Sequence, residues 1–391
     1  MINRINASED SILSEWLSRE EALERLKVRA QTLYAYVSRG RIGMRPDGAD
    51  PRRSQYRADD IAALATRRAR GRSPSAIAES AIAWGEPSIA TSISTVLHGR
   101  LIYRGRDAVA LSGHATLEET AAVLWELSEP AVFASPPPGA PHRGGRAAAF
   151  ARLALAAAEG RPSLGRGATS LHADAAQAVG VLASAFGAPA GPDPVHRRLA
   201  QGWSVDAGGA EAIRRTLVLL ADHELNASTF AARVAASTGA PLAACLLAGF
   251  ATLSGPRHGG AGEAVMQLAE DGARHGADAT IRRWLSHDRP LPGFGHPLYP
   301  DGDPRAAALL ATIDADETLQ QLKTAAIAAT GAHPNVDFAL AALTRSLGLP
   351  RDAPFRLFAL GRSVGWAAHT VEQVTSGGAI RPRGRYEGLL P

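Results

Sequence analysis

The chain has 391 residues, of which 46% are hydrophobic and 20% are charged, so it is a folded globular protein too long for one small core. It has no apolar run of the roughly eighteen residues that cross a bilayer and no signal-peptide pattern at its N-terminus, and we expect a cytoplasmic protein. The net charge of +4 is uneven, because residues 25–72 hold thirteen Arg and Lys against four Asp. The single cysteine, Cys245, excludes an internal disulfide and lies in an apolar stretch that predicts burial.

The composition along the chain predicts four segments: a flexible tail over 1–16, a compact unit over 17–66, a basic linker over 67–80 and a main body over 81–391. In the compact unit, Ser18 and Glu21 have the spacing of a capping box at the start of a first helix that ends near Leu26. A second helix, "AQTLYAYVSRG", ends at Gly40, a short wing follows, and a third helix begins near Asp59.

This order is similar to the winged helix-turn-helix of the MerR and excisionase type, mainly through "TLYAYVSRGRI" and "YRADDIAAL". The resemblance implies that the second helix enters the major groove of DNA while the wing touches the backbone. The candidate nucleic-acid contacts are Gln31, Thr32, Tyr34, Tyr36, Arg39, Arg41, Arg52 and Arg53. The alternative is a solvated basic face that serves packing or dimerisation.

From residue 81 onward, apolar residues at helical spacing predict a mainly α fold. The segment 94–106 is the best strand signal, a hairpin with His98 and Gly99 near its turn. Helices are expected over 116–128, 208–225, 228–238, 337–348 and 355–374.

Four polar clusters interrupt these apolar helices. They carry His223 in "DHELNASTF", His258 in "GPRHGGAGEAV", His296 and Arg305 in "GFGHPLYPDGDPR", and Asp337 in "HPNVDFAL". Toward the C-terminus, Arg362 interrupts an apolar helix face, and "IRPRGRYEG" carries Arg381, Arg383 and Arg385. Taken singly, each has a bland explanation: a histidine in the core or at the surface, an N-cap, or an arginine that snorkels. Together they offer no nucleophile motif and no histidine pair at metal-binding spacing, so we expect no metal. Arginines suit recognition of carboxylates, and a carboxylate with neutral histidines suits proton abstraction next to a carbonyl.

The motifs "HELNAST", "GPRHGGAGEA", "GFGHPLYPDGDPR", "NVDF", "GRSVGWAAHTVEQ" and "RPRGRYEG" resemble those of citrate synthase, in the family's order. With "TSISTVLHGRLIYRGRDAVAL", the resemblance spans roughly residues 85–391. It implies a large helical domain with a smaller closing domain over about 262–355, an intertwined homodimer, and no cofactor beyond the cosubstrate. The implied reaction condenses an acyl-CoA, acetyl-CoA or propionyl-CoA, with oxaloacetate and then hydrolyses the thioester.

The resemblance also implies roles. Asp337 would be the general base, His258 would bind the thioester oxygen, and His296 would polarise the ketone of oxaloacetate. His258 would be kept neutral by the N-terminus of a helix. The oxaloacetate carboxylates would be held by His223, Arg305 and Arg362, with Arg381 from a partner subunit.

The sequence also departs from the family. Gly262 replaces the Asn of "HGGAN", Arg257 precedes His258, and both the stretch from Arg305 to Asp337 and the region around 130–200 are short. Two alternatives therefore remain beside a synthase: a DNA-binding regulator that uses the fold to sense a metabolite, and an enzyme that cleaves citryl-CoA.

Overall fold

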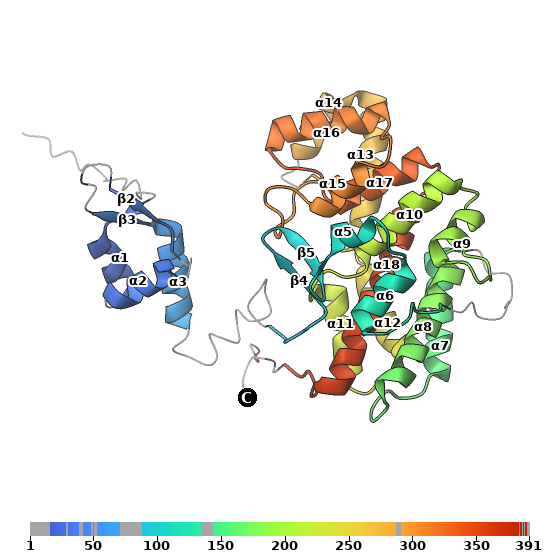
Figure 1. The fold of residues 1–391 in the computed structure, drawn as a ribbon. Coiled ribbons are helices and arrows are strands. Elements are labelled where there is room, and N and C mark those ends of the chain that lie inside the picture. Colours follow the sequence, from blue (N-terminus) through green and yellow to red (C-terminus); the bar gives the residue numbers. More distant parts are fainter. Residues whose placement is uncertain are drawn as a thin grey trace, which may run out of the picture. The chain divides into compact units, whose positions relative to one another are not determined.

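The computed structural model describes residues 16–28, 30–38, 42–47, 50, 53–70, 88–133, 144–286, 291–382, 384, 386 and 388. The chain divides into two compact units, residues 1–90 and 91–391 (Figure 1).

The N-terminal unit contains, in order, β1 Trp16–Leu17, α1 Arg19–Leu26, α2 Ala30–Ser38, β2 Met44–Pro46, β3 Ser54–Arg57 and α3 Ala58–Arg70. The predicted capping box is confirmed, since Ser18 Oγ accepts from Glu21 N and Glu21 Oε2 accepts from Ser18 N. The strands form an antiparallel sheet in the order β1-β3-β2. One hydrophobic cluster holds the unit together: Leu17, Ala22, Leu26, Leu33, Ile42, Tyr56, Ile61 and Leu64.

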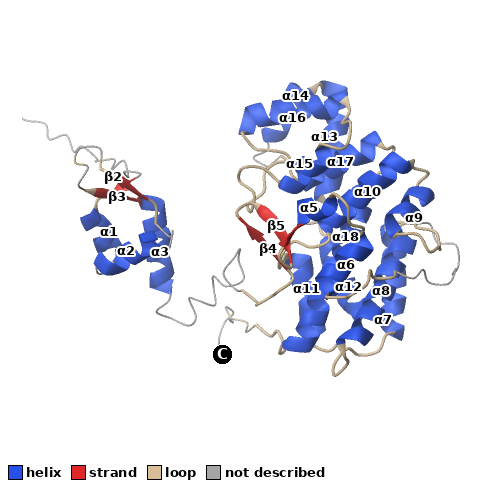
Figure 2. Ribbon diagram, viewed as in Figure 1, coloured by secondary structure: helices blue, strands red, loops and turns tan. Residues whose placement is uncertain are grey.

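The second unit is mainly helical, as predicted (Figure 2). Its strands are β4 Ser94–Leu97, β5 Arg100–Tyr103 and β6 Arg106–Asp107. Its helices are α5 Ala108–Ser112, α6 Leu117–Trp125, α7 Arg146–Glu159, α8 Ala168–Ala185, α9 Val195–Gly202, α10 Ala207–Leu220, α11 Ala227–Ser237, α12 Leu242–Leu253, α13 Ala261–His275, α14 Ala277–Leu285, α15 Pro304–Leu310, α16 Glu317–Thr330, α17 Val336–Ser346 and α18 Ala353–Ser376. No helix within these described segments is both long and apolar enough to cross a membrane.

Local chemistry sets several of these boundaries. The predicted hairpin is confirmed, with β4 paired to β5 and positive φ angles at His98 and Gly99. The helix expected over 116–128 stops at Trp125, because Glu126 adopts the left-handed conformation. The helix expected over 208–225 stops at Leu220, so His223 lies in a loop rather than on a helix.

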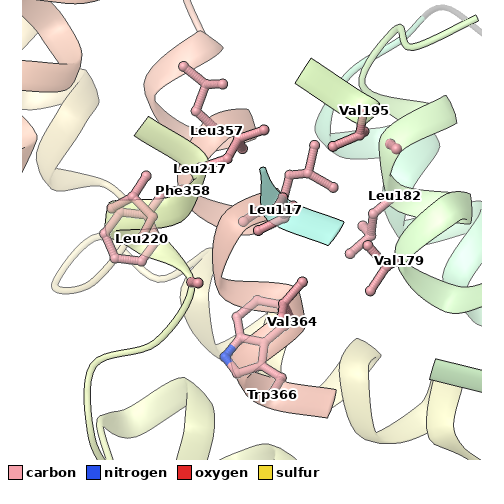
Figure 3. Close-up of a cluster of buried hydrophobic side chains, with 14 of the residues drawn as sticks. Leu117, Val179, Leu182, Val195, Leu217, Leu220, Leu357, Phe358, Val364 and Trp366 are labelled. Carbon is pink, nitrogen blue, oxygen red and sulfur yellow. The ribbon is translucent and has the colours of Figure 1, made fainter. Parts of the chain in front are cut away.

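The larger hydrophobic core surrounds α18, which contacts α6, α8, α10, α11 and α12 (Figure 1). Figure 3 shows Trp366, Val364 and Phe358 of α18 among apolar side chains of the neighbouring helices. Trp366 is fully buried, and its Nε1 donates to Ser228 Oγ. Cys245 is also buried in this unit, as expected, and burial raises the pKa of its thiol to about 12.

A second, smaller hydrophobic core is formed by α13, α14, α16 and α17, which lie together at one end of the unit (Figure 1). Helix α17 contributes to both cores. Val336, Ala339, Leu340 and Leu343 face the larger one, and Phe338, Ala341 and Ala342 face the smaller. Both sets follow helical spacing, so opposite sides of one helix are buried in different clusters. Asp337 lies on this shared helix.

Candidate active site

Six of the seven residues that the sequence assigned to substrate or catalysis come together in the second unit. They lie on the loop after α10 (His223), the turn before α13 (His258), the loop and first turn of α15 (His296, Arg305), the start of α17 (Asp337) and the middle of α18 (Arg362). The rings of His223 and His296 contact each other directly, with their centroids 5.2 Å apart. The seventh residue, Arg381, is exposed beyond the end of α18.

Tyr299 joins the two histidines and an arginine. Its hydroxyl lies 2.9 Å from His223 Nε2, its ring lies 5.0 Å from that of His296, and the Arg305 guanidinium stands 5.3 Å from its centre. Burial raises the pKa of Tyr299 to about 12, so the phenol keeps its proton. Burial also lowers the pKa of His223 well below its ordinary value, with Arg305 and Arg362 adding to the effect.

Arg305 is fixed by a carboxylate that the sequence reading did not single out. Asp303 accepts from Arg305 Nε at 3.0 Å and from Nη2 at 2.8 Å, and both side chains are almost fully buried. Burial would lower the pKa of Arg305, but Asp303 outweighs it, and the net shift is upward. The same Asp303 carboxylate accepts from Val336 N at 3.0 Å. It therefore connects the arginine to the start of the helix that carries Asp337.

Arg362 is 1% exposed and keeps part of its guanidinium unused. Its Nε donates to Leu220 O at 3.0 Å, and it stacks 4.9 Å above the ring of Phe358. Its Nη2 is buried with no hydrogen-bond partner among the described residues. Burial lowers the pKa of Arg362 to about 10, which leaves it charged at neutral pH. A buried cation with an unmet donor is suited to an anionic ligand.

His258 is positioned through Ser228. The Asn226 side chain caps α11, accepting from the backbone N–H groups of Ser228 and Thr229, and it also accepts from Ser228 Oγ at 2.7 Å. Because the single proton of the Ser228 hydroxyl is donated to Asn226, that hydroxyl accepts both from Trp366 Nε1 and from His258 Nε2, which lies 2.9 Å away. Burial, followed by Arg362, lowers the pKa of His258 to about 4. Burial and the nearby Arg362 thus favour the neutral imidazole.

Asp337 is the second residue of α17 and is not its N-cap. Asn335 occupies that position and accepts from Asp337 N at 3.0 Å. Burial raises the pKa of the Asp337 carboxyl to about 6, and Arg305 and Arg362 hold it from rising further. Burial likewise lowers the pKa of His296 to about 4. At neutral pH the site therefore holds an ionised carboxylate, neutral histidines and two arginines.

The candidate nucleic-acid residues are described only in part. Arg39, Arg41 and Arg52 lie outside the described residues, as do the side chain of Gln31 and the predicted end of the helix at Gly40. Tyr34 is exposed with Arg19 over its ring, and Arg53 is exposed beside Asp50, whereas Thr32 and Tyr36 are partly buried.

Gly262, the departure from the expected Asn, has a packing explanation. It is buried in the first turn of α13, where a Cβ would lie 2.8 Å from Pro354 Cβ. Gly208 holds the equivalent position in α10, and a Cβ there would meet only Asp206 Oδ1 at 3.6 Å. A side chain at 262 therefore requires α13 to move away from the start of α18.

We expect Gly262→Ala to lower the free energy of unfolding by about 1–3 kcal/mol, because the proline ring cannot yield. The matched Gly208→Ala should raise it by about 0.5–1 kcal/mol through reduced backbone entropy of the unfolded chain. Urea unfolding of both variants measures the difference. Equal stabilisation by the two alanines would show that the Pro354 contact is not restrictive.

Residues 160–383, more than half of the chain, match the family model described as citrate synthase, C-terminal domain. Citrate synthase 2 of Bacillus subtilis is 39% identical over 189 residues, covering 46% of this chain and 51% of that protein. The 2-methylcitrate synthase of Shewanella oneidensis is 37% identical over 188 residues, covering 45% and 50%. The chain thus spans about half the length of the curated relatives it matches.

Among solved structures, citrate synthase from Thermotoga maritima aligns with a TM-score of 0.62 and 26% sequence identity. The alignment covers 78% of this chain and 95% of that one. The architecture is therefore the mainly helical citrate synthase fold.

Proposed function

Since this chain belongs to the citrate synthase family, we propose that it condenses an acyl-CoA with oxaloacetate and hydrolyses the resulting thioester. The observation that carries the proposal is the composition of the site. Asp337, whose pKa is about 6, lies near the buried Arg305 and Arg362. The same site holds His258 and His296, whose pKa values are about 4. The arginines suit a dicarboxylate, and the carboxylate suits removal of a weakly acidic C–H proton.

In the proposed reaction, the Asp337 carboxylate takes a proton from the carbon next to the thioester carbonyl. The electron pair of that C–H bond forms an enol or enolate whose oxygen is stabilised by a hydrogen bond from His258. The nucleophilic carbon then attacks the ketone of oxaloacetate, and His296 delivers a proton to the ketone oxygen as the C–C bond forms. Water finally attacks the thioester carbonyl, the C–S bond breaks, and the CoA thiol leaves.

The Ser228 hydroxyl controls which nitrogen of His258 carries the proton. Its bond to Asn226 Oδ1 places the proton of His258 on Nε2 in the free protein. For Nδ1 to donate to the thioester oxygen, the Ser228 hydroxyl must turn from Asn226 and donate to Nε2 instead. The hydroxyl turns by rotation about one C–O bond, while the imidazole loses its Nε2 proton to solvent and gains one on Nδ1, so that the ring is neutral in both arrangements.

Release of CoA thiol from the full chain supplied with oxaloacetate and acetyl-CoA or propionyl-CoA tests the function. The relatives include both a citrate synthase and a 2-methylcitrate synthase at similar identity, so the ratio of kcat/KM for the two thioesters assigns the acyl group. Release that requires both substrates supports the proposal, and its absence with every acyl-CoA tried refutes it. Thiol release from citryl-CoA plus water alone would test the second half-reaction.

The pH profile should have one acidic limb set by Asp337. Because its carboxyl has a pKa of about 6, we expect kcat/KM to fall about tenfold per pH unit below that value, as the base becomes protonated. His258 and His296 remain neutral until about pH 4, so they add no limb between the two values. A profile that is flat from about pH 7 to pH 5 would exclude Asp337 as the base.

A homodimer would complete the substrate site. We propose that Arg381 of the partner subunit contacts an oxaloacetate carboxylate, since Arg381 is exposed beyond the end of α18. The proposal also includes closure of the smaller domain, approximately residues 262–355, over bound oxaloacetate. Sedimentation of the full chain should show a dimer, and a monomer with full activity would refute the shared site.

A second function is proposed for the N-terminal unit, namely DNA binding by a winged helix-turn-helix. It is supported by the net charge of +9 over residues 25–72 and by exposed Arg45, Arg53 and Arg57 on or beside the β2–β3 hairpin. Binding to duplex DNA should weaken steeply as salt is raised. If the full chain shows no affinity for duplex DNA at low salt, the basic face serves another purpose.

A further inference from the structure

Helix α18 holds the loop that carries His223 through three successive bonds. Arg362 Nε donates to Leu220 O at 3.0 Å, Gly365 N donates to Ala221 O at 2.9 Å, and His369 Nε2 lies 3.1 Å from Asp222 Oδ2. The three α18 residues lie on one face of the helix, and they contact three consecutive residues, the last of α10 and the first two of the loop. Gly365 is required for this approach, because a Cβ there would lie 2.3 Å from Asp222 Oδ1.

The strand β4 holds the same loop from its other side. Ser94 Oγ donates to Asp222 Oδ2 at 2.5 Å and accepts from Glu224 N at 3.0 Å. Glu224 Oε1 in turn accepts from Val96 N at 2.6 Å. Both neighbours of His223 in the chain are thus fixed, while the His223 side chain extends to Tyr299.

The direction of the His369–Asp222 bond follows from Arg233. The Arg233 Nη1 atom lies 3.2 Å from His369 Nδ1, and a guanidinium can only donate. Nδ1 therefore carries no proton, and Nε2–H donates to the carboxylate of Asp222. Arg233 is itself held by Gln373, which is buried, and by Glu372, which is partly buried, so side chains in and at the edge of the core set the tautomer of His369.

Asp222 provides a negative charge next to Arg362 without occupying its free nitrogen. Burial would raise the pKa of Asp222, but His369, Arg362 and Ser94 outweigh it and the net shift is downward, so the carboxylate is ionised. Asp222 Oδ1 and Arg362 Nη2 are both buried without hydrogen-bond partners among the described residues. Arg305 differs, because two of its nitrogens are taken by Asp303.

We propose that Asp222 and His369 are positioning residues for the oxaloacetate site, which fix His223 and Arg362 relative to each other from behind the ligand. Asp222 balances the charge of Arg362 and leaves Nη2 available to a carboxylate, and His369 fixes the orientation of Asp222. This role rests on the proposed function only for the identity of the ligand. Neither residue touches the substrate, and their effect should therefore appear in oxaloacetate binding.

The test compares His369→Leu with His369→Gln, whose amide Nε2 can still donate to Asp222. We expect His369→Leu to raise the oxaloacetate Kd, measured by titration calorimetry, about tenfold, or about 1.4 kcal/mol. His369→Gln should stay within about threefold of the native Kd, and the KM for acyl-CoA should change less than threefold in both. Ser94→Ala removes the other bond to Asp222 and gives the same test if His369→Leu does not fold.

The control is His196→Leu. His196 is 6% exposed on α9, outside the site, so its loss measures the general effect of replacing a buried histidine. We expect it to lower the melting temperature but leave the oxaloacetate Kd unchanged. If His369→Leu and Ser94→Ala lower the melting temperature and leave the oxaloacetate Kd unchanged, Asp222 and His369 have only a structural role and the inference is overturned.

Binding without turnover separates this inference from the proposed function. A native chain that binds oxaloacetate but releases no CoA refutes the condensation, and the Kd series still decides whether His369 positions the site. A native chain that does not bind oxaloacetate refutes both.

Discussion

Asp337→Asn is expected to lower kcat for CoA release by a factor of about 10²–10⁴, because an amide cannot accept the proton that the carboxylate is proposed to remove. The exchange is nearly isosteric, and Asp337 N keeps its bond to Asn335 Oδ1, so α17 should start at the same residue. Burial already penalises the charge at this position, as its pKa of about 6 shows, and the neutral amide should not destabilise the fold. The loss should therefore fall on kcat.

The readouts are thiol release, the oxaloacetate Kd and the melting temperature. Asp174→Asn is the matched control, since Asp174 lies on α8, which contributes none of the site residues, and pairs with Arg166 in the preceding loop. We expect it to retain native kcat, and we expect both variants to bind oxaloacetate within about threefold of the native chain. An Asp337→Asn protein that keeps more than about a tenth of native kcat would mean that another group takes the proton.

Asp303→Ala is expected to lower the free energy of unfolding by about 3–5 kcal/mol, because it leaves Arg305 buried without its counter-charge. Asp303 also accepts from Val336 N and caps α15, so three sets of donors lose their acceptor at once. Oxaloacetate binding should weaken as well, since the guanidinium is no longer held in one orientation. Denaturant unfolding and the oxaloacetate Kd measure the two effects.

Two comparisons isolate the buried charge. Glu270→Ala removes the exposed pair with Arg351, and it should cost less than about 1 kcal/mol. Adding Arg305→Met to Asp303→Ala should restore much of the stability but none of the oxaloacetate affinity, because the uncompensated cation is gone along with the ligand's partner. If the double variant is no more stable than Asp303→Ala, the destabilisation comes from the lost backbone bonds rather than from charge.

The sequence was sufficient for features that depend on local spacing. Periodicity located α11, α17 and α18, and the turn residues His98 and Gly99 located the β4–β5 hairpin. The polar motifs identified six residues that the fold brings together. The sequence did not predict β1, because a two-residue segment has no periodicity and forms a strand only by pairing with β3.

Within the site, the sequence could not reveal which residues far apart in the chain contact each other. Asp222 and His369 lie 147 positions apart, and no spacing rule joins a loop residue to a residue in the fifth turn of a distant helix. Tyr299 and Asp303 stood inside a motif already singled out, but only the fold shows that they contact His223 and Arg305. Similarly, the low pKa of His258 depends on burial and on Arg362, neither of which is readable from its neighbours.

Helix α17 links two kinds of evolutionary constraint. Its opposite sides are buried in different cores, and the proposed base lies between them on the same rigid element. A change in side-chain volume at Phe338, Ala341 or Ala342 would shift the helix and move Asp337 with it. Selection would then act against substitutions in the smaller core that lower the catalytic rate as well as against those that impair folding. Sequence change there should be slower than packing alone would permit, although these residues are buried in a hydrophobic core.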